Sequence, residues 1–267
     1  MSVQRYFITL SYDGTNYHGW QIQPNGMSVE ERLRQALSTL LRQSVETVGA
    51  GRTDAGVHAR KMVVHFDYEF SEDSLPTSDL IDGQMIDCQQ LVYRLNRLLP
   101  RDIAVQSVEP VASDLHARFS ATSRTYHYYI HTRKDPFLSN YSCEMHYPLD
   151  FEAMNEAAEW LLTQTDFASF CKAGADVKTT LCTLTHAHWH QFSDDSWRFE
   201  ITANRFLRNM VRAIVGTLFA VGNGRLPLEE FRKVLAAADR GAAGESAPAE
   251  GLALVEVAYP EEIFTPV

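Results

Sequence analysis

Residues 49 to 60 read GAGRTDAGVHAR, and this stretch lies between two runs with strand composition, Val45 to Gly49 and Met62 to Phe70. Its three glycines permit a sharp turn and the close approach of a ligand to the backbone. Arg52 and Asp54 are two residues apart, so on an extended segment they point to the same side and present a carboxylate beside a guanidinium. An isolated RTDAG string is more often an ordinary turn, because Asp and Gly are common in turns. In this setting the stretch predicts a site loop.

The first half of the chain has the order strand, helix, strand, strand, helix, strand. The expected elements are a strand in RYFITLSYDG, a helix from the Ser28 capping box to Gln43, strands at 45–49 and 62–70, a helix from Gln89 to Leu99 and a strand from Ile103 to Val108. The acidic segment from Ser71 to Asp87 is expected to be an exposed insertion. Two helices on one face of an antiparallel sheet form a ferredoxin-like split unit, so the order predicts an α+β fold.

The second half shows a similar alternation of element types. The expected elements are a strand from Arg118 to Ile130, a helix from Phe151 to Gln164, strands at 181–190 and 196–203, a helix carrying Arg205, Arg208 and Arg212, a helix from Glu229 to Arg240, a flexible loop at 241–251 and a strand from Leu252 to Val257. On the first of these strands Tyr126 and Tyr128 share one face, while His127 and Tyr129 share the other. At 267 residues the chain is expected to form two domains.

Several segments together resemble one protein family. GRTDAGVHA resembles the signature of the TruA family of tRNA pseudouridine synthases, and YDGTNYHGWQIQ, HARFSATSRTYHYYI, DFASF, FLRNMVRAIVG and GLALVEVAYP resemble family segments in family order. The resemblance covers nearly the whole chain. It implies two ferredoxin-like halves, 1–109 and 110–267, that form a largely antiparallel sheet flanked by helices, with the active-site cleft between the halves.

The same resemblance implies the catalytic residues. Asp54 matches the family's nucleophile, Arg212 matches the arginine that pairs with it, and Tyr126 matches the active-site tyrosine. The residues expected to contact RNA are Gln21 and Gln23, from the resemblance, and Arg52 and Arg208, as members of basic clusters. Arg52 could instead assist Arg212 in holding Asp54 at the loop. Trp20 is expected to be a core anchor, and His58 to position its neighbours rather than to act as an acid or base.

The implied reaction detaches uracil from its ribose and reattaches it through carbon 5, with no redox change and no hydrolysis, so no cofactor or metal is expected. Asp54 could add to the anomeric carbon or to carbon 6 of the ring, and the proton could be removed by Tyr126, by Asp54 or by water. A single carboxylate argues against a glycoside hydrolase, which uses two. A uridine in a stem must also be flipped out before it can react.

Two alternatives belong to other functional classes. A catalytically silent RNA-binding protein would keep the basic clusters without needing Asp54 beside Arg212. A metal-dependent hydrolase could be built on His186, His188 and His190, which alternate along one strand. The metal is disfavoured because no companion carboxylate or Cys stands at ligand spacing.

The overall charge is acidic, with 24 Lys and Arg against 34 Asp and Glu, whereas phosphate binding needs a positive surface. Binding depends on the local field, and the basic residues cluster along the chain. These are Arg32, Arg34, Arg42, Arg52, Arg60, Lys61, Arg118, Arg124, Arg205, Arg208 and Arg212. The sequence therefore predicts that basic and acidic side chains lie on different faces.

Hydropathy, the N-terminal residues and the cysteine spacing bear on the cellular location, and the resemblance bears on the assembly. No run approaches the roughly 18 apolar residues of a membrane span, and the N-terminus has no secretory pattern, so a cytoplasmic protein is expected. The four cysteines lie far apart without a CxxC spacing, which predicts reduced thiols. The resemblance implies a homodimer that acts on uridines of the 3′ side of the anticodon stem-loop of tRNA.

Overall fold

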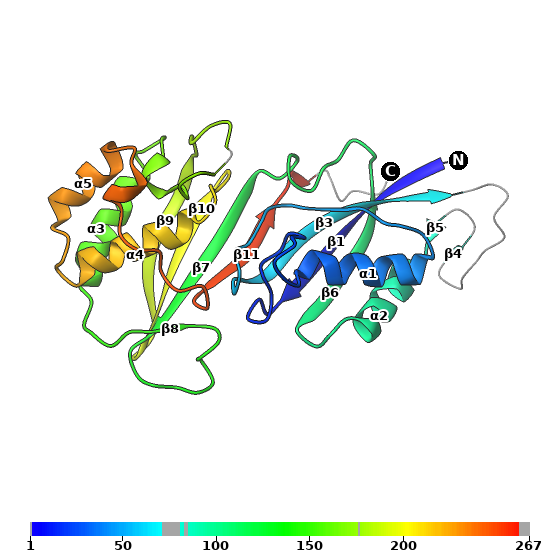
Figure 1. The fold of residues 1–267 in the computed structure, drawn as a ribbon, viewed down its shortest axis with the longest axis horizontal. Coiled ribbons are helices and arrows are strands. Elements are labelled where there is room, and N and C mark those ends of the chain that lie inside the picture. Colours follow the sequence, from blue (N-terminus) through cyan, green and yellow to red (C-terminus); the bar gives the residue numbers. More distant parts are fainter. Residues whose placement is uncertain (1, 71–80, 83–84, 176, 262–267) are drawn as a thin grey trace. The chain divides into compact units, whose positions relative to one another are not determined.

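The computed structural model describes residues 2–70, 81–82, 85–175 and 177–261, and they group into two compact units (Figure 1). Unit 1 comprises Met1–Thr122 with Glu256–Val267, and unit 2 comprises Ser123–Val255. The predicted domain boundary between residues 109 and 110 falls inside strand β6 (Ile103–Val111). That each half folds as a domain of its own stays a prediction.

Unit 1 is built on an antiparallel sheet. Its central strand β1 (Ser2–Tyr12) pairs with β6 on one side and with β3 (His58–Phe70) on the other, and β2 (Thr47–Gly49) pairs with β3. Tyr6 lies opposite Phe66 in this register, and their rings stack with centroids 5.3 Å apart. The strand order β6-β1-β3-β2 and the observed elements confirm a mixed α+β fold with largely antiparallel strands.

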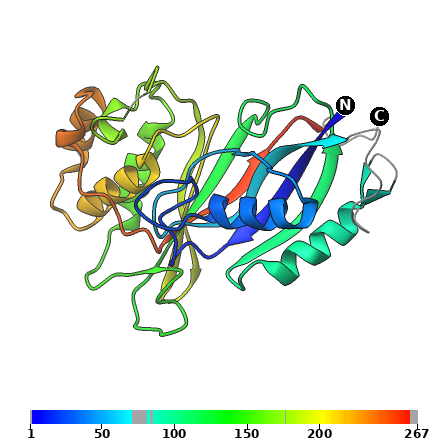
Figure 2. The same ribbon diagram turned by 45° about the vertical axis from the view of Figure 1, so that its right-hand side comes forward.

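Two helices, α1 (Val29–Leu41) and α2 (Cys88–Leu98), cover the same face of the unit 1 sheet (Figure 2). The predicted N-cap of α1 is confirmed, because Ser28 Oγ accepts a hydrogen bond from the Glu31 backbone N–H at 3.2 Å. The helix ends earlier than the predicted Gln43, since Arg42 takes a left-handed φ of 55°.

The acidic segment predicted as an insertion lies largely outside the described residues. Its described parts are two short paired strands, β4 (Ile81–Asp82) and β5 (Met85–Ile86). The Ile86 backbone N–H donates to Tyr6 Oη at 3.1 Å, which ties β5 to the first strand of the sheet.

Unit 2 is also built on antiparallel strands. β10 (Ser196–Ala203) pairs with β7 (Ser123–His131) and with β9 (Leu184–Ser193), and the short β8 (Cys143–Glu144) adds a parallel pair to β7. The β10 bounds match the prediction, whereas β7 begins at Ser123 rather than Arg118. The remaining strand, β11 (Leu252–Ala258), is divided between the two units.

The helices of unit 2 are α3 (Phe151–Leu161), α4 (Met210–Gly222) and α5 (Leu228–Ala236), with single 3-10 turns η1 (Ala168–Phe170) and η2 (Arg240–Ala242). The expectation that Arg205, Arg208 and Arg212 share one helix is wrong. Asn209 adopts a left-handed φ of 63° directly before α4, so Arg205 and Arg208 precede the helix and Arg212 alone lies on it.

The segment that follows η2 was expected to be a flexible loop, but the structure shows it bonded to α4. The Gly244 N–H donates to Thr217 Oγ1 at 2.9 Å, and the Ala247 N–H donates to the Arg212 carbonyl at 2.9 Å. This approach requires Gly216, because a Cβ there would stand 1.7 Å from the Glu245 carbonyl oxygen. The loop therefore rests directly on the backbone of the helix.

The four cysteines are free thiols, as predicted. Among the helices of the described residues, none has both the length and the hydropathy that a membrane crossing requires.

Candidate active site

The site loop is an irregular connection between β2 and β3 in unit 1. Thr53 is buried, whereas Arg52 is exposed and Asp54 is half-buried. The turn closes where the Val57 N–H donates to the Asp54 carbonyl at 3.1 Å. Gly56 takes the expected left-handed φ of 78°, whereas Gly51 has neither a left-handed φ nor a close neighbour, so the turn does not require a glycine at position 51.

A second segment, residues 12 to 20, holds the site loop in place. Tyr12 Oη and Thr53 Oγ1 are 2.8 Å apart, and the Trp20 N–H donates to the Thr53 carbonyl at 3.2 Å. Gly19, with a φ of 86°, makes this contact possible, because a Cβ there would lie 2.3 Å from the Thr53 carbonyl oxygen. The backbone on the N-terminal side of Asp54 is thus fixed by direct packing.

Trp20 and Glu30 anchor the segment that carries Gln21 and Gln23, the two glutamines expected to contact RNA. Trp20 is 2% exposed, which confirms its prediction as a core residue. The Glu30 carboxylate accepts from the Ile22 N–H at 3.1 Å and from Thr47 Oγ1 at 3.3 Å, and burial raises the pKa of Glu30. Gln21 and Gln23 are both exposed, and the Gln23 side chain donates to the His18 carbonyl. Both glutamines therefore lie on the surface of a segment whose backbone is anchored by Trp20 and Glu30.

His58 joins the start of β3 to the same supporting segment. Its side chain is buried, and its Nδ1 accepts a hydrogen bond from the Gly14 N–H at 3.1 Å. Asp13 Oδ1 also lies 3.1 Å from this nitrogen. The position agrees with a structural role for His58 next to the loop.

Tyr126 lies on β7 in unit 2, and the alternation predicted for this strand is observed. Tyr126 and Tyr128 are buried on one face, whereas His127 and Tyr129 are half-buried on the other. His127 Nδ1 and Tyr129 Oη are 3.0 Å apart. The Tyr126 ring is 8% exposed and meets the Phe206 ring edge-on, with centroids 5.2 Å apart. The Tyr128 hydroxyl donates to the Pro248 carbonyl at 2.9 Å.

Arg212 is half-buried in the first turn of α4. Its Nε donates to the Ala247 carbonyl at 2.7 Å, and its own carbonyl accepts from the Ala247 N–H. The loop bonded to α4 therefore sets the direction of the guanidinium. Arg208, in contrast, is exposed, and its carbonyl accepts from the Lys172 N–H at 3.0 Å.

The strand histidines correct one premise of the sequence argument. Glu200 lies on β10 opposite His188, and its carboxylate approaches His186 Nε2 at 3.9 Å. Ligand atoms of His186, His190 and Glu200 all lie within 4.8 Å of one another, so a companion carboxylate is present. The same carboxylate also meets Arg198 at 3.3 Å and His127 at 3.2 Å, and a bound cation would compete with them. The prediction of no metal stays a prediction.

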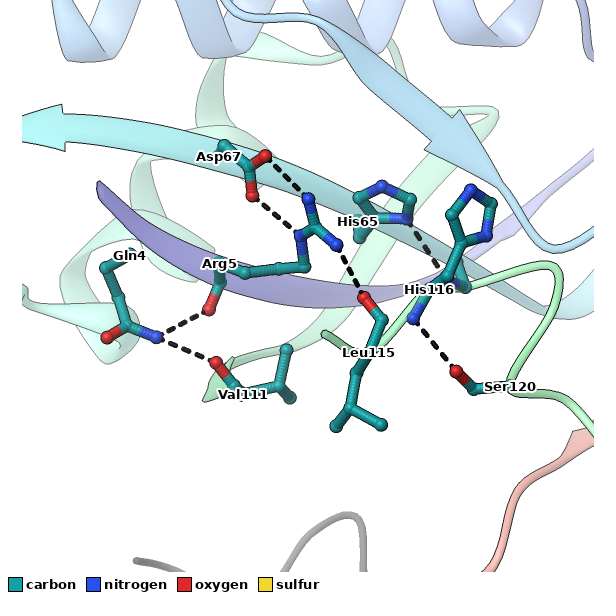
Figure 3. Close-up of polar contacts among 9 residues, drawn as sticks. Gln4, Arg5, His65, Asp67, Val111, Leu115, His116 and Ser120 are labelled. Carbon is teal, nitrogen blue, oxygen red and sulfur yellow. Dashed lines mark hydrogen bonds and ion pairs between the residues drawn. The ribbon is translucent and has the colours of Figure 1, made fainter. Parts of the chain in front are cut away.

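Sequence reasoning missed a polar network on the helix-free face of the unit 1 sheet (Figure 3). Arg5 makes two hydrogen bonds of 2.7 Å to the Asp67 carboxylate, and these lower the pKa of Asp67. The remaining Arg5 nitrogen donates to the Leu115 carbonyl at 2.8 Å. His65 Nδ1 accepts from the Ala117 N–H at 3.1 Å, and burial lowers the pKa of His65 to about 4.

The depressed pKa of His65 predicts that acid destabilises the protein. An unfolded histidine takes up a proton near pH 6.5, whereas buried His65 resists protonation until about pH 4, so the unfolded state binds more protons between these values. The free energy of unfolding should therefore fall by up to about 3 kcal/mol between pH 7 and pH 4 through this residue.

Urea unfolding of the wild type and of His65→Asn at the two pH values measures this effect. Asn keeps an acceptor for the Ala117 N–H but does not titrate, so the variant should lose less stability on acidification. An equal loss in both proteins would rule out His65 as a source of the pH dependence.

Residues 8–120 and 157–260 match the family model described as tRNA pseudouridine synthase. The chain is 55% identical over 264 residues to tRNA pseudouridine synthase A of Bacteroides fragilis, a match that covers 99% of this chain and 100% of that protein. The proteins of the same name from Parabacteroides distasonis and Bacillus pumilus are 53% and 39% identical, with 98% and 94% of this chain and 98% and 97% of those proteins covered.

Proposed function

Because this chain belongs to the tRNA pseudouridine synthase family, we propose that Asp54 is the nucleophile with which it isomerises uridine in the anticodon stem-loop of tRNA. Isomerisation of tRNA uridine to pseudouridine is the activity that its relatives carry in their names. The observation that carries the proposal is the fixed backbone around a half-buried Asp in the GRTDAG stretch. A nucleophile needs such a fixed approach, since correct orientation supplies much of the rate of a covalent step.

Asp54 adds to the uridine, at the anomeric carbon or at carbon 6, and the bond between nitrogen 1 and the anomeric carbon breaks, which lets the base turn over. Carbon 5 then bonds to the anomeric carbon and the bond to Asp54 breaks. Carbon 5 loses its proton and nitrogen 1 gains one, so the product has the same composition as the substrate. Neither electrons nor water are consumed, which is why no cofactor is proposed. The uridine must leave the stem before Asp54 can reach it.

Tyr126 and Arg212 complete the proposed site. Tyr126 presents a ring suited to stacking on the uracil and a hydroxyl near the proton that must be removed. Arg212 acts as the charge partner of the Asp54 carboxylate, and the Ala247 carbonyl that binds its Nε supports this role by limiting how the guanidinium can point. Arg52, Arg208, Gln21 and Gln23 are proposed to contact the RNA.

The proposed assembly extends this assignment. Each half is proposed to be ferredoxin-like, supported in unit 1 by the strand order β6-β1-β3-β2 with α1 and α2 on one face. We place the active-site cleft between the halves, and the working enzyme in the cytoplasm as a homodimer that binds one tRNA across both subunits.

Release of tritium from carbon 5 of uridine in a tRNA transcript tests the function, run with and without a chelator. Release that the chelator leaves unchanged is the expected result. Tight binding of tRNA without release of tritium would identify a catalytically silent RNA-binding protein instead. Tritium release that stops when the chelator is added would indicate that the enzyme depends on a metal ion.

Arg212→Met should lower kcat more than Arg208→Met, because only Arg212 is assigned to the catalytic carboxylate. The lost charge-assisted hydrogen bond is worth about 1.5–3 kcal/mol, which corresponds to roughly a 10- to 150-fold slower single-turnover rate. Thermal unfolding of both variants controls for the lost bond to Ala247. Equal rate losses at equal stability would mean that Arg212 has no special role.

A further inference from the structure

We propose that Phe119 is a stacking platform for an unpaired nucleobase of the bound tRNA, distinct from the uridine that reacts. The inference rests on the proposed function, because it takes tRNA as the partner. Phe119 is 75% exposed, and it lies in the segment of residues 112–122 that joins β6 to β7. A single exposed apolar ring is common on protein surfaces, so the inference depends on how this ring is held and on the charge beside it.

Three side chains of unit 1 bind the backbone of this segment directly, and a fourth acts through one of them, which leaves the backbone little freedom. Arg5 binds the Leu115 carbonyl, His65 binds the Ala117 N–H, and the Tyr259 hydroxyl donates to the Ala117 carbonyl at 2.5 Å. Asp67 fixes Arg5 from the other side with its two hydrogen bonds. Figure 3 shows the contacts of Arg5 with Asp67 and with Leu115.

His116 braces the turn from within. Its Nδ1 lies 3.1 Å from the Arg118 N–H and 3.3 Å from the Phe119 N–H, both of which donate to it. The backbone N–H of His116 donates to Ser120 Oγ at 2.9 Å, and the backbone N–H of Ser120 donates to the His116 carbonyl at 2.9 Å. Burial, together with the charges of Arg5 and Arg118, lowers the pKa of His116, so the ring remains a neutral acceptor near neutral pH.

The rings themselves form a stepped stack that ends at the surface. His65 and His116 meet edge to face with centroids 4.6 Å apart, and His116 meets Phe119 at 4.3 Å with a tilt of 34°. The exposed Phe119 ring thus has its position fixed by the half-buried His116 ring before any ligand arrives. A preorganised ring loses little conformational entropy on binding, which favours affinity.

The charge beside the ring favours RNA as the occupant. The Arg118 guanidinium carbon lies 5.6 Å from the Phe119 ring centroid, and Arg118 is exposed. An aromatic ring that takes a base and an arginine that takes its phosphate or stacks beside it is the usual combination in single-strand recognition.

The platform is too far from Asp54 to hold the reacting base. Asp54 precedes the first residue of β3, His58, whereas His65 lies near the middle of that strand. At about 3.3 Å per residue this separates the two places by roughly 20 Å along the strand. The base on Phe119 is therefore a positioning contact, and its loss should weaken binding without slowing the chemical step.

Phe119→Ala should weaken the binding of a tRNA transcript roughly 5- to 150-fold, the usual range for one stacked base, while kcat at saturating tRNA stays within about twofold. Phe119→Trp, which keeps an aromatic ring at this position, should retain the affinity for tRNA. A single-stranded uridine-rich oligonucleotide should lose affinity for Phe119→Ala, and an RNA duplex of equal length should not, since its bases are already stacked. The matched control is Phe192→Ala, because Phe192 is 58% exposed but stands beside Asp194 and Asp195.

Three outcomes would overturn the assignment. They are an unchanged Kd for tRNA, an equal loss on duplex and single strand, and a change of sedimentation that shows Phe119 joining two copies of the chain. Pseudouridine formation by the wild type is measured on the same transcript. If it occurs while one of these outcomes is seen, the role of Phe119 is wrong and the proposed function stands.

Discussion

Asp54→Asn should abolish pseudouridine formation, with a loss of at least about 10⁴-fold in the single-turnover rate. The amide has the shape of the carboxylate but cannot attack carbon, so the covalent step has no nucleophile. The backbone on both sides of residue 54 is held by bonds that do not involve its side chain, including those of Thr53 and Val57. The loop should therefore keep its conformation, and the affinity for tRNA should stay within a few-fold of the wild type.

Quenched-flow measurement with a saturating tRNA transcript gives the rate, and a filter-binding titration gives the affinity. Arg52→Gln is a useful companion, because Arg52 lies in the same loop and is exposed. It should weaken RNA binding more than Asp54→Asn does. A substantial residual rate in Asp54→Asn would remove this residue from its role.

Tyr126→Phe should keep tRNA binding and slow the reaction about 10²- to 10⁴-fold, the usual effect of a positioned acid or base. The phenylalanine ring retains the edge-on contact with Phe206, so packing on that face of β7 is preserved. Tyr126→Ala should damage both binding and turnover, because removing a ring that is 8% exposed also leaves a cavity.

Single-turnover rates for the two variants, with thermal unfolding beside them, separate the hydroxyl from the ring. Tyr129→Phe is the control, since it removes a hydroxyl from the opposite face of the same strand. If Tyr126→Phe matches the wild type, the residue serves only for stacking, and the proton is removed by Asp54 or by water.

Local patterns in the sequence predicted most of the elements, because helix and strand periodicity reflects which face is buried. The bounds of β10 and the N-cap of α1 were predicted from residues within the element itself. The start of β7 was not, since the composition of residues 118–122 resembles a strand but their backbone is bonded to His116 and Ala258. The start of α4 depends on one left-handed residue, Asn209, whose conformation no periodicity reveals.

The same limit applies to the sites. A motif match predicted Asp54, Tyr126 and Arg212 as catalytic residues, and these assignments stay predictions. Glu200 was missed because strand pairing, and not sequence spacing, brings it to His186. Phe119 was passed over because nothing in HARFSATS distinguishes an exposed ring from a buried one. Pairing across a sheet is decided by residues far away in the chain, so such neighbours require the fold.

The contact of Gly216 with the loop above α4 has a consequence for how this protein could lose activity. A single methyl group at Gly216 would push the Glu245 carbonyl away from the helix, and the displaced loop would carry with it Ala247, to which Arg212 is bonded. Gly216→Ala would then misalign the guanidinium of Arg212, which is proposed to be catalytic, without altering any charged or aromatic group. The proposed active site is therefore vulnerable to steric crowding at a position that takes no part in its chemistry.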